Sequence, residues 1–398
     1  MPGGGEDLVT RVTIVQPLVR HYRIPLFDAL ASEHGIDLTV VSAGADPLEQ
    51  GLGHLGSLPY LDDQHPWVTL PPTGALMWQR DLGHVHLGEH GDVLIVSGNL
   101  RYLSNWPLML RARHRGLGVV WWTHGRTRQP KRAAEALRVK VMRWADAVLL
   151  YTDEEVTWYR DKVAPPEKLF ATNNTIDEAP IRKAIAYWDA ARLALFRADR
   201  QLGDEPLLLY CGRLKPLARV ELALYALRKL HDAGLRARLV VIGDGSERET
   251  LQSLAQELGI AHKVHWTGAL YDQMELAPWF LCSRAFVYPG PIGLGLMHSL
   301  HYGLPVITHS NRTNHKPEIA ALQDGVNCLL FSEANVEALA AKIKLILDNL
   351  PLRDKLSRGA LRTVRERYSL ERMVKGFIGA VRHASASAVN RRHTRLKE

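Results

Sequence analysis

The feature that most limits the fold of this chain is a repeated alternation of short apolar runs with segments of helical periodicity. In the first half, strand-like runs at 12–16, 92–97 and 118–123 are separated by segments whose apolar residues recur at the spacing of a helix. Strands that alternate with helices build parallel sheets with helices on both faces. The alternation therefore predicts a doubly wound α/β fold.

The second half repeats this pattern, which predicts a second Rossmann-like domain. Its apolar runs include 206–212, 237–243 and 284–290, and Ser246 and Glu249 have the spacing of a capping box at the start of a helix. A chain of 398 residues has room for two domains at the usual size of roughly 100–200 residues each. If two such domains face each other across a cleft, the carboxyl ends of two parallel sheets meet, which is where ligands bind.

Changes in composition mark the limits of these domains. A polar segment that begins with NNTIDEAP at 173–180 separates the halves, and the end of the chain is rich in Ala, Ser, Arg and His. The sequence predicts an N-terminal Rossmann-like domain at 1–180, a C-terminal Rossmann-like domain at 181–365, a helix at 366–382 that crosses back, and a flexible basic tail at 383–398.

Positive charge is concentrated in the first half. The formal net charge of the chain is +8, whereas the segment 101–145 holds eleven Lys and Arg residues and a single Glu. This segment should exert a positive field toward an anionic partner. Within it, 131–144 has apolar residues at helical spacing from Ala134 through Leu137 to Trp144. This helix either packs an apolar stripe on the core or contacts an anionic membrane surface, and no nucleic-acid-binding motif is present.

Composition excludes several other classes of protein. Hydrophobic residues make up 46% and no stretch approaches the ~18 apolar residues of a membrane span. The N-terminal MPGGGEDLVTR lacks the features of a signal peptide, so we expect a cytoplasmic protein, with association at the inner face of the membrane as the alternative. Cys211, Cys282 and Cys328 are far apart, which argues against disulfides or a cysteine-rich zinc site.

The strongest chemical signal is YPGPIGLGLMHSLHYGLPVITHS at 288–310. A strand-like run leads into a Gly- and Pro-rich turn and then into a helix, whose first turn has unpaired backbone N–H groups. The first turn of such a helix can bind a diphosphate through these N–H groups. The alternative is an ordinary tight turn between a strand and a helix. Arg213 and Lys215 follow another strand of the same domain. They either converge on this anion site or are solvated surface charges.

These motifs resemble those of family 4 glycosyltransferases, which are retaining enzymes of the GT-B fold that use nucleotide-sugar donors. The resemblance covers nearly the whole chain and is densest at 207–381, through YCGRL, VVIGDGSERETLQSLAQELGI, VHWTGAL, FVYPG, GLPVITHS and ERYSLERMVKGF. In the first half it rests on WWTHG and NNTID. It implies a metal-independent enzyme that takes a nucleoside-diphosphate sugar as co-substrate and no other cofactor.

The resemblance also assigns roles to residues. Arg213 would bind the donor diphosphate, and His124, at the end of a strand, would lie beside the transferred sugar; the alternative for His124 is a structural role. The implied donor site comprises Arg213, Lys215, Arg219, Leu270, Gly290, Pro291, Ile292, Gly293, Leu294, His298 and Glu318. No residue is assigned to a metal.

Two departures from the family pattern concern the donor site. The family has a Lys five residues after the Arg, where this chain has Ala218, so either Lys215 or Arg219 substitutes for it or donor affinity is reduced. The two glutamates of the family fall on Gly290 and His298. His298 either holds the ribose through its imidazole or packs behind the loop.

A third departure follows the first strand. The usual Gly-rich turn is replaced there by VRHYRIP at 19–25. Arg20, His21, Tyr22 and Arg23 in this segment are candidates to contact the acceptor or a phosphate, and exposed surface cations are the alternative.

The sequence thus leads to the retaining transfer of a sugar from a nucleoside-diphosphate sugar to a hydroxyl of a glycan, glycolipid or small-molecule acceptor. Surface polysaccharide or glycolipid biosynthesis is the expected pathway. Two alternatives remain. Ala218, Gly290 and His298 together suit a non-catalytic relative that binds a partner or a sugar, and the same fold supports nucleotide-sugar epimerisation or hydrolysis.

Overall fold

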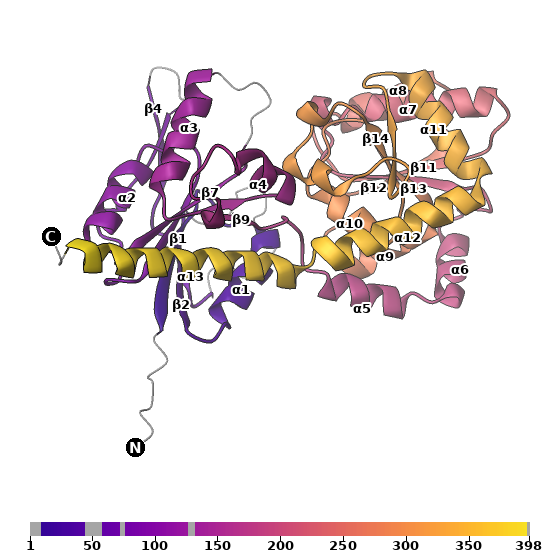
Figure 1. Ribbon diagram of the computed structural model, residues 1–398. Helices are drawn as coiled ribbons and strands as arrows, with labels where there is room; N and C mark the ends of the chain where they lie inside the picture. Colours follow the sequence, from indigo (N-terminus) through magenta and orange to yellow (C-terminus); the bar gives the residue numbers. More distant parts are fainter. Residues whose placement is uncertain (1–8, 44–57, 72–75, 126–131, 396–398) are drawn as a thin grey trace. The chain divides into compact units, whose positions relative to one another are not determined.

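The structure is a computed structural model that describes residues 9–43, 58–71, 76–125 and 132–395 (Figure 1). The chain divides into unit 1, which comprises Met1–Asn174 and Leu370–Glu398, and unit 2, Thr175–Ser369. The boundary falls within the polar segment 173–180. Each unit contains a parallel sheet of the doubly wound type, which confirms the predicted fold class. The cleft between the domains stays a prediction.

Unit 1 is built on a seven-stranded parallel sheet. In spatial order its strands are β3 (Leu61–Asp62), β2 (Ile36–Val41), β1 (Thr10–Val15), β6 (Val93–Ser97), β7 (Gly118–Thr123), β8 (Ala147–Leu150) and β9 (Leu169–Ala171). Every residue of β7 and β8 is buried, because helices cover both faces of the sheet. The direction of winding changes between β1 and β6, the point at which ligands bind in such sheets.

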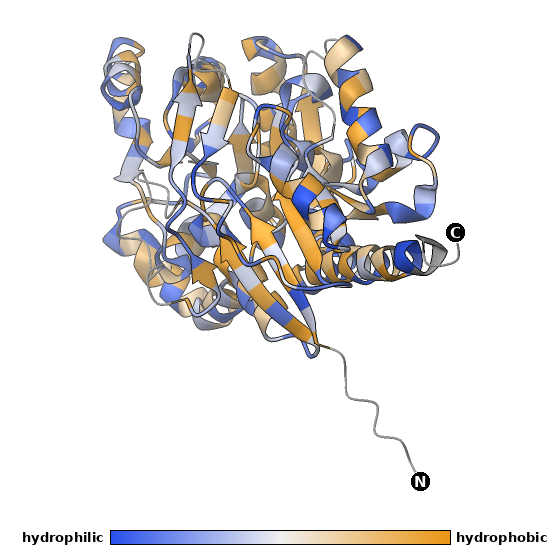
Figure 2. Ribbon diagram, turned by 90° about the vertical axis from the view of Figure 1, so that its left-hand side faces the viewer, coloured by the Kyte–Doolittle hydropathy of each residue, from blue (hydrophilic) through white to orange (hydrophobic). Residues whose placement is uncertain are grey.

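The helices of unit 1 form the two covering layers. They are α1 (Ile24–Ala31) and α13 (Leu370–Arg395) on one face, and α2 (Asn105–His114), α3 (Arg132–Trp144) and α4 (Asp153–Tyr159) on the other. In Figure 2 long runs of apolar orange follow the strands, whereas the helices alternate orange with blue. An antiparallel pair, β4 (Trp67–Leu70) and β5 (Leu76–Gln79), lies outside the main sheet and was not predicted.

The last helix, α13, lies against the sheet of unit 1 (Figure 1). The sequence predicts a helix that ends at 382 and a flexible tail, but the helix continues to Arg395. Ala384 and Ala388 are buried, and a Cβ on Gly118 would lie only 2.5 Å from the carbonyl oxygen of Ala384. Small residues at helical spacing let α13 pack closely on β7, which corrects the predicted tail for 383–395. Residues 396–398 lie outside the described residues.

Unit 2 is built on a six-stranded parallel sheet. In spatial order its strands are β12 (Val264–Gly268), β11 (Arg238–Ile242), β10 (Leu207–Cys211), β13 (Ser283–Tyr288), β14 (Val306–His309) and β15 (Cys328–Phe331). This is the strand order of dinucleotide-binding sheets, with the change of winding between β10 and β13. The carboxyl ends of β10 and β13 are therefore the expected ligand site of the unit.

Helices also cover both faces of the second sheet. They are α7 (Val220–Asp232), α8 (Arg248–Glu257) and α11 (Val336–Asp348) on one face, and α5 (Ala179–Tyr187), α6 (Ala190–Asp199), α9 (Gln273–Cys282), α10 (Gly295–His301) and α12 (Leu350–Arg367) on the other. The predicted capping box at Ser246 is wrong, because the N-cap of α8 is Glu247 and no side chain caps it.

The basic helix α3 buries only part of its apolar stripe. Its buried residues are Arg138, Val141 and Met142, whereas Leu137 is 44% exposed. Arg138 tolerates burial because it forms an ion pair with Glu135. The outer side of α3 therefore combines an exposed leucine with cations, while the basic residues at 126, 128 and 131 lie outside the described residues. Within the described residues, no helix has both the length and the apolar character to span a membrane.

Candidate functional site

Two loops meet at the carboxyl edge of the unit 2 sheet, where β10 and β13 are neighbours. One carries Arg213, and the other is the predicted diphosphate turn. A Cβ on Gly290 would clash with the carbonyl oxygen of Leu217 and lie 2.6 Å from that of Ala218. The two backbones are thus in direct contact, and this close approach requires glycine at position 290. The structure brings together the two segments that the sequence assigns to a diphosphate.

The first loop presents positive charge. Arg213 and Lys215 are exposed, and neither side chain has a hydrogen-bond or ion-pair partner among the described residues. Arg219 instead donates to a carboxylate oxygen of Glu221 at 2.7 Å, from a left-handed backbone with φ of 54°. Of the two candidates to replace the missing Lys at Ala218, Lys215 is available and Arg219 is engaged.

The second loop is fixed by His315, which the sequence analysis did not single out. The N–H of Ile292 donates to Nδ1 of His315 at 3.1 Å, and Nε2 of the same ring donates to the carbonyl oxygen of His309 at 2.8 Å. Because Nδ1 accepts a hydrogen bond, the ring is neutral. The Ile292 amide is therefore not available to a ligand. The N–H groups of Gly293 and Leu294 have no partner in the described part of the chain.

Lys316 is a third cation at this edge. Its N–H donates to the carbonyl oxygen of Ile292 at 3.0 Å, and a Cβ on Gly293 would lie 3.2 Å from its Cγ. Its side chain is exposed and has no partner among the described residues. His315 and Lys316 were not predicted, because they lie in the loop after β14. Their only signal is their position directly before the Pro317 turn.

The remaining predicted donor residues have packed surroundings. Glu318 is buried in a short helical turn, Pro317–Ala321. Pro291 is half-buried beside Gly290. His298 is half-buried in α10, with its Nδ1 atom 3.4 Å from Nε2 of Gln273, which favours the packing role over the ribose-binding one.

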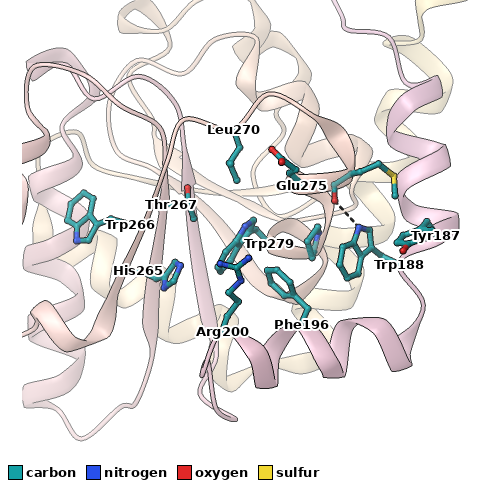
Figure 3. Close-up of a pocket in the computed structure, with 12 residues that line it drawn as sticks. Tyr187, Trp188, Phe196, Arg200, His265, Trp266, Thr267, Leu270, Glu275 and Trp279 are labelled. Carbon is teal, nitrogen blue, oxygen red and sulfur yellow. Dashed lines mark hydrogen bonds between the residues drawn. The ribbon is translucent and has the colours of Figure 1, made fainter. Parts of the chain in front are cut away.

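A cavity of about 650 Å³ opens beside β12 on one flank of unit 2 (Figure 3). Leu270 and His265 line it, together with Trp188 and Trp279. The Trp188 indole donates to the carbonyl oxygen of Met274 at 2.9 Å. Of the predicted donor residues only Leu270 lines this cavity, so the cavity is distinct from the edge that carries Arg213.

In unit 1, His124 and Arg23 meet at Tyr151. The exposed His124 ring stacks on Tyr151 with 3.9 Å between ring centroids, and Arg23 donates to the Tyr151 hydroxyl at 3.2 Å. Arg23 is only 6% exposed, and its guanidinium carbon lies 4.9 Å from the centroid of Trp122. Arg23 is therefore not the surface cation of the alternative prediction but is held by cation–π attraction.

Tyr151 contacts both His124 and Arg23, which the sequence analysis assigned to separate sites. The only sequence feature that points to Tyr151 is that it is an aromatic residue directly after a strand. The other acceptor-side candidates lie near Arg23. His21 is exposed, Arg20 and Tyr22 are half-buried, and the rings of His21 and Tyr22 are in edge contact at 5.7 Å.

Acid should weaken unit 2 through two imidazoles. Burial lowers the pKa of His315 and that of His301 to about 4, from the usual 6.5. Between pH 4 and 6.5 the unfolded chain binds more protons than the folded one, so the free energy of unfolding falls as the pH falls through this window. The expected loss is up to about 3 kcal/mol for each imidazole, measured by urea denaturation at a series of pH values.

A His315→Gln variant supplies the control. Its amide oxygen can accept from the Ile292 N–H and its NH₂ can donate to the His309 carbonyl, but it does not titrate. The variant should therefore have a shallower pH dependence of unfolding than the parent. An identical dependence in both proteins would contradict the contribution of His315.

Comparison with known proteins finds similarity to glycosyltransferases. Residues 194–363 match the family model of glycosyl transferases group 1. A GDP-mannose-dependent alpha-(1-6)-phosphatidylinositol dimannoside mannosyltransferase from Mycobacterium tuberculosis is 30% identical over 159 residues, which cover 39% of each protein. The match thus spans well under two thirds of the length of that relative.

Two solved structures match the fold over almost the whole chain. A glycosyltransferase from Rickettsia africae ESF-5 aligns with a TM-score of 0.72 at 15% identity, over 94% of this chain and 98% of that one. Anabaena HepE in complex with UDP aligns with a TM-score of 0.67 at 13% identity, over 93% and 98%. Residues 194–363 are thus similar to the glycosyl transferases group 1 family, in a chain that has the GT-B fold.

Proposed function

We propose that this chain transfers a sugar from a nucleoside-diphosphate sugar to a hydroxyl of a glycan, glycolipid or small-molecule acceptor, with retention of configuration. The observation that carries the proposal is the contact between the Arg213 loop and the turn at Gly290. A guanidinium and two amide groups that have no partners among the described residues suit the charge of a diphosphate. The names of the relatives support such donors, since one is GDP-mannose-dependent and another was solved with UDP.

In this proposal unit 2 stabilises the leaving group. Negative charge grows on the diphosphate as the bond to the sugar breaks, and Arg213 with the amides of Gly293 and Leu294 donates hydrogen bonds to it. Such donors act strongly in a site that is already organised, because little reorganisation is needed during the reaction. Lys215 and Lys316 add positive potential at the same edge. We assign charge stabilisation to these groups, without a metal ion.

Unit 1 is assigned to the acceptor and the transferred sugar. His124 is exposed at the end of β7 and stacks on Tyr151, whose hydroxyl accepts a hydrogen bond from Arg23. In the proposal His124 contacts the sugar, and Arg20, His21 and Tyr22 lie on the acceptor side. Arg23 and Tyr151 are positioning residues.

A peripheral contact with an anionic membrane is part of the proposal. On α3 the exposed Leu137 is accompanied by exposed Arg132, Lys140 and Arg143, and Leu110 on α2 is 62% exposed. Apolar side chains among cations bind to the surface of anionic lipid. This contact would bring a cytoplasmic enzyme to a lipid-linked acceptor, the kind that the name of the mycobacterial relative describes.

Thermal unfolding in the presence of GDP, UDP, ADP and their sugars tests the donor assignment. A diphosphate at 100 times its Kd should add about 2.7 kcal/mol to the stability of the folded state. Product analysis with that donor should then show sugar transfer only when an acceptor is present. If none of these nucleotides stabilises the chain, the proposal is wrong.

Two other outcomes would point to different activities. Nucleotide binding without turnover would favour a non-catalytic relative. The reason to consider this alternative is that Gly290 and His298 stand in place of the two glutamates of the family. An altered sugar nucleotide in the absence of acceptor would favour an epimerase or hydrolase.

A further inference from the structure

A cavity of about 350 Å³ lies at the edge of the unit 1 sheet opposite His124. It is formed by the loop before β6, the end of α2 with the turn before β7, and the end of α13. The amino ends of these parallel strands share this edge, whereas His124 follows the carboxyl end of β7. The polar residues that line the cavity are His90, Arg113, His114, Arg115, Arg391 and Arg392.

Two of these arginines are fixed by the fold. Arg391 forms an ion pair with the buried Asp146 and donates to the carbonyl oxygen of Leu117 at 2.8 Å. Arg113 donates to the carbonyl oxygen of Trp144. These bonds join α13, α2 and the segment after α3, so they set the walls of the cavity.

Three of the other polar groups have no partner among the residues that the structure describes. The guanidinium groups of Arg115 and Arg392 are exposed and bond to nothing else in the described part of unit 1. Nε2 of His90 is buried and also has no hydrogen-bond partner there. Gly116 packs against this ring, since a Cβ at 116 would lie 2.6 Å from its Cδ2. A buried polar atom without a partner costs free energy, which a bound acceptor atom would offset.

Helix ends alone do not account for this arrangement. Cations gather at the carboxyl ends of helices because the helix dipole is negative there, and both α2 and α13 end at the cavity. That effect explains Arg113, which is bonded to a carbonyl oxygen. It does not explain a pocket that has no carboxylate in its lining and that contains a buried His90 nitrogen without a hydrogen-bond partner among the described residues.

We propose that this cavity binds a ligand that carries phosphate groups, either a soluble diphosphate or the headgroup of a phospholipid. Phosphate oxygens accept several hydrogen bonds at once, and the planar donors of arginine match them. A water molecule takes up about 30 Å³ of liquid, so the cavity has room for more than one phosphate group. The site is separate from the donor site and does not depend on the proposed function.

Calorimetric titration of the whole chain with inorganic pyrophosphate tests the first source. Sedimentation with phosphatidylcholine vesicles, with and without phosphatidylglycerol, tests the second. Arg115→Gln/Arg392→Gln should weaken binding at least about tenfold, because charge-assisted hydrogen bonds are lost, and His90→Phe should also weaken it, because the hydrogen bond of Nε2 is lost. The matched control, Arg80→Gln/Arg160→Gln, removes two exposed arginines of unit 1 outside the cavity and should bind as the parent does.

Pyrophosphate can also reach the proposed donor site, so Arg213→Ala is the second control and should retain the binding that Arg115 and Arg392 provide. If the Arg115→Gln/Arg392→Gln variant loses affinity for pyrophosphate, the ligand is a soluble diphosphate. If it loses affinity only for phosphatidylglycerol vesicles, the ligand is a lipid headgroup. The proposal is overturned if neither probe binds, or if the Arg115/Arg392 variant binds both probes as tightly as the Arg80/Arg160 control.

Discussion

Replacing Arg213 with alanine should lower kcat/KM by at least about a hundredfold, because one organised donor to a developing anion contributes about 3–4 kcal/mol. Arg213 is exposed at the switch point of the unit 2 sheet and has no partner among the described residues. Its removal therefore breaks no bond within the protein, and the loss should come from the diphosphate alone. Steady-state kinetics with the donor found in the nucleotide panel measures the effect.

Two variants separate this role from general effects of charge. Arg236→Ala removes an exposed arginine just before β11, at the opposite edge of the same sheet, and should leave kcat/KM unchanged. Arg213→Lys should recover only part of the activity, since lysine lacks the planar pair of donors. If Arg213→Ala turned over at a near-normal rate, the assignment of the diphosphate to this edge would be wrong.

Gly290→Ala should have the second large effect, on both stability and activity. The added methyl group would collide with backbone carbonyl oxygens of Leu217 and Ala218, which cannot rotate away as a side chain can. Overpacking of this kind costs about 1–3 kcal/mol of folding free energy. It would also push the Arg213 loop away from the turn after β13, and a displacement of about 1 Å can cost a hundredfold in rate. Urea denaturation and kcat/KM measure the two effects.

The same close contact predicts the effect of placing a glutamate, the residue that the family has, at position 290. Gly290→Glu should be at least as damaging as Gly290→Ala, although it reinstates a glutamate, because the Leu217 backbone occupies the space. Gly295→Ala is the matched control, since its Cβ would meet its nearest neighbour, the carbonyl oxygen of Cys211, at an ordinary 3.7 Å. A Gly290→Glu variant with raised activity would show that the two loops do not pack as described.

The sequence alone predicts the fold class well, because the strands of both sheets are short and almost wholly apolar. The meeting of the Arg213 and Gly290 loops was also predictable, since both follow strands that a doubly wound sheet places side by side. The course of α13 was not. Alanine and serine near the end of a chain resemble a frayed tail, and only the close approach of Ala384 to Gly118 shows that small side chains are what the packing requires.

Contacts between distant loops could not be predicted from the sequence for a different reason. His315 lies 23 residues from Ile292 and fixes it through a single hydrogen bond, which leaves no periodic pattern. For Arg23 the sequence left open a contact with the acceptor or a phosphate and an exposed surface cation, yet its guanidinium lies over the rings of Trp122 and Tyr151. On α3 the sequence did not show that the ion pair of Arg138 with Glu135 places a charged residue on the buried side, next to Val141 of the apolar stripe.

The most direct measurement is a crystal structure of the chain with the nucleoside diphosphate that stabilises it most. The diphosphate oxygens should lie within hydrogen-bond distance of the Arg213 guanidinium and of the N–H groups of Gly293 and Leu294. A diphosphate bound elsewhere, such as in the cavity lined by Trp188 and Trp279, with Arg213 in solvent, would contradict the assignment of the donor to the β10 and β13 loops.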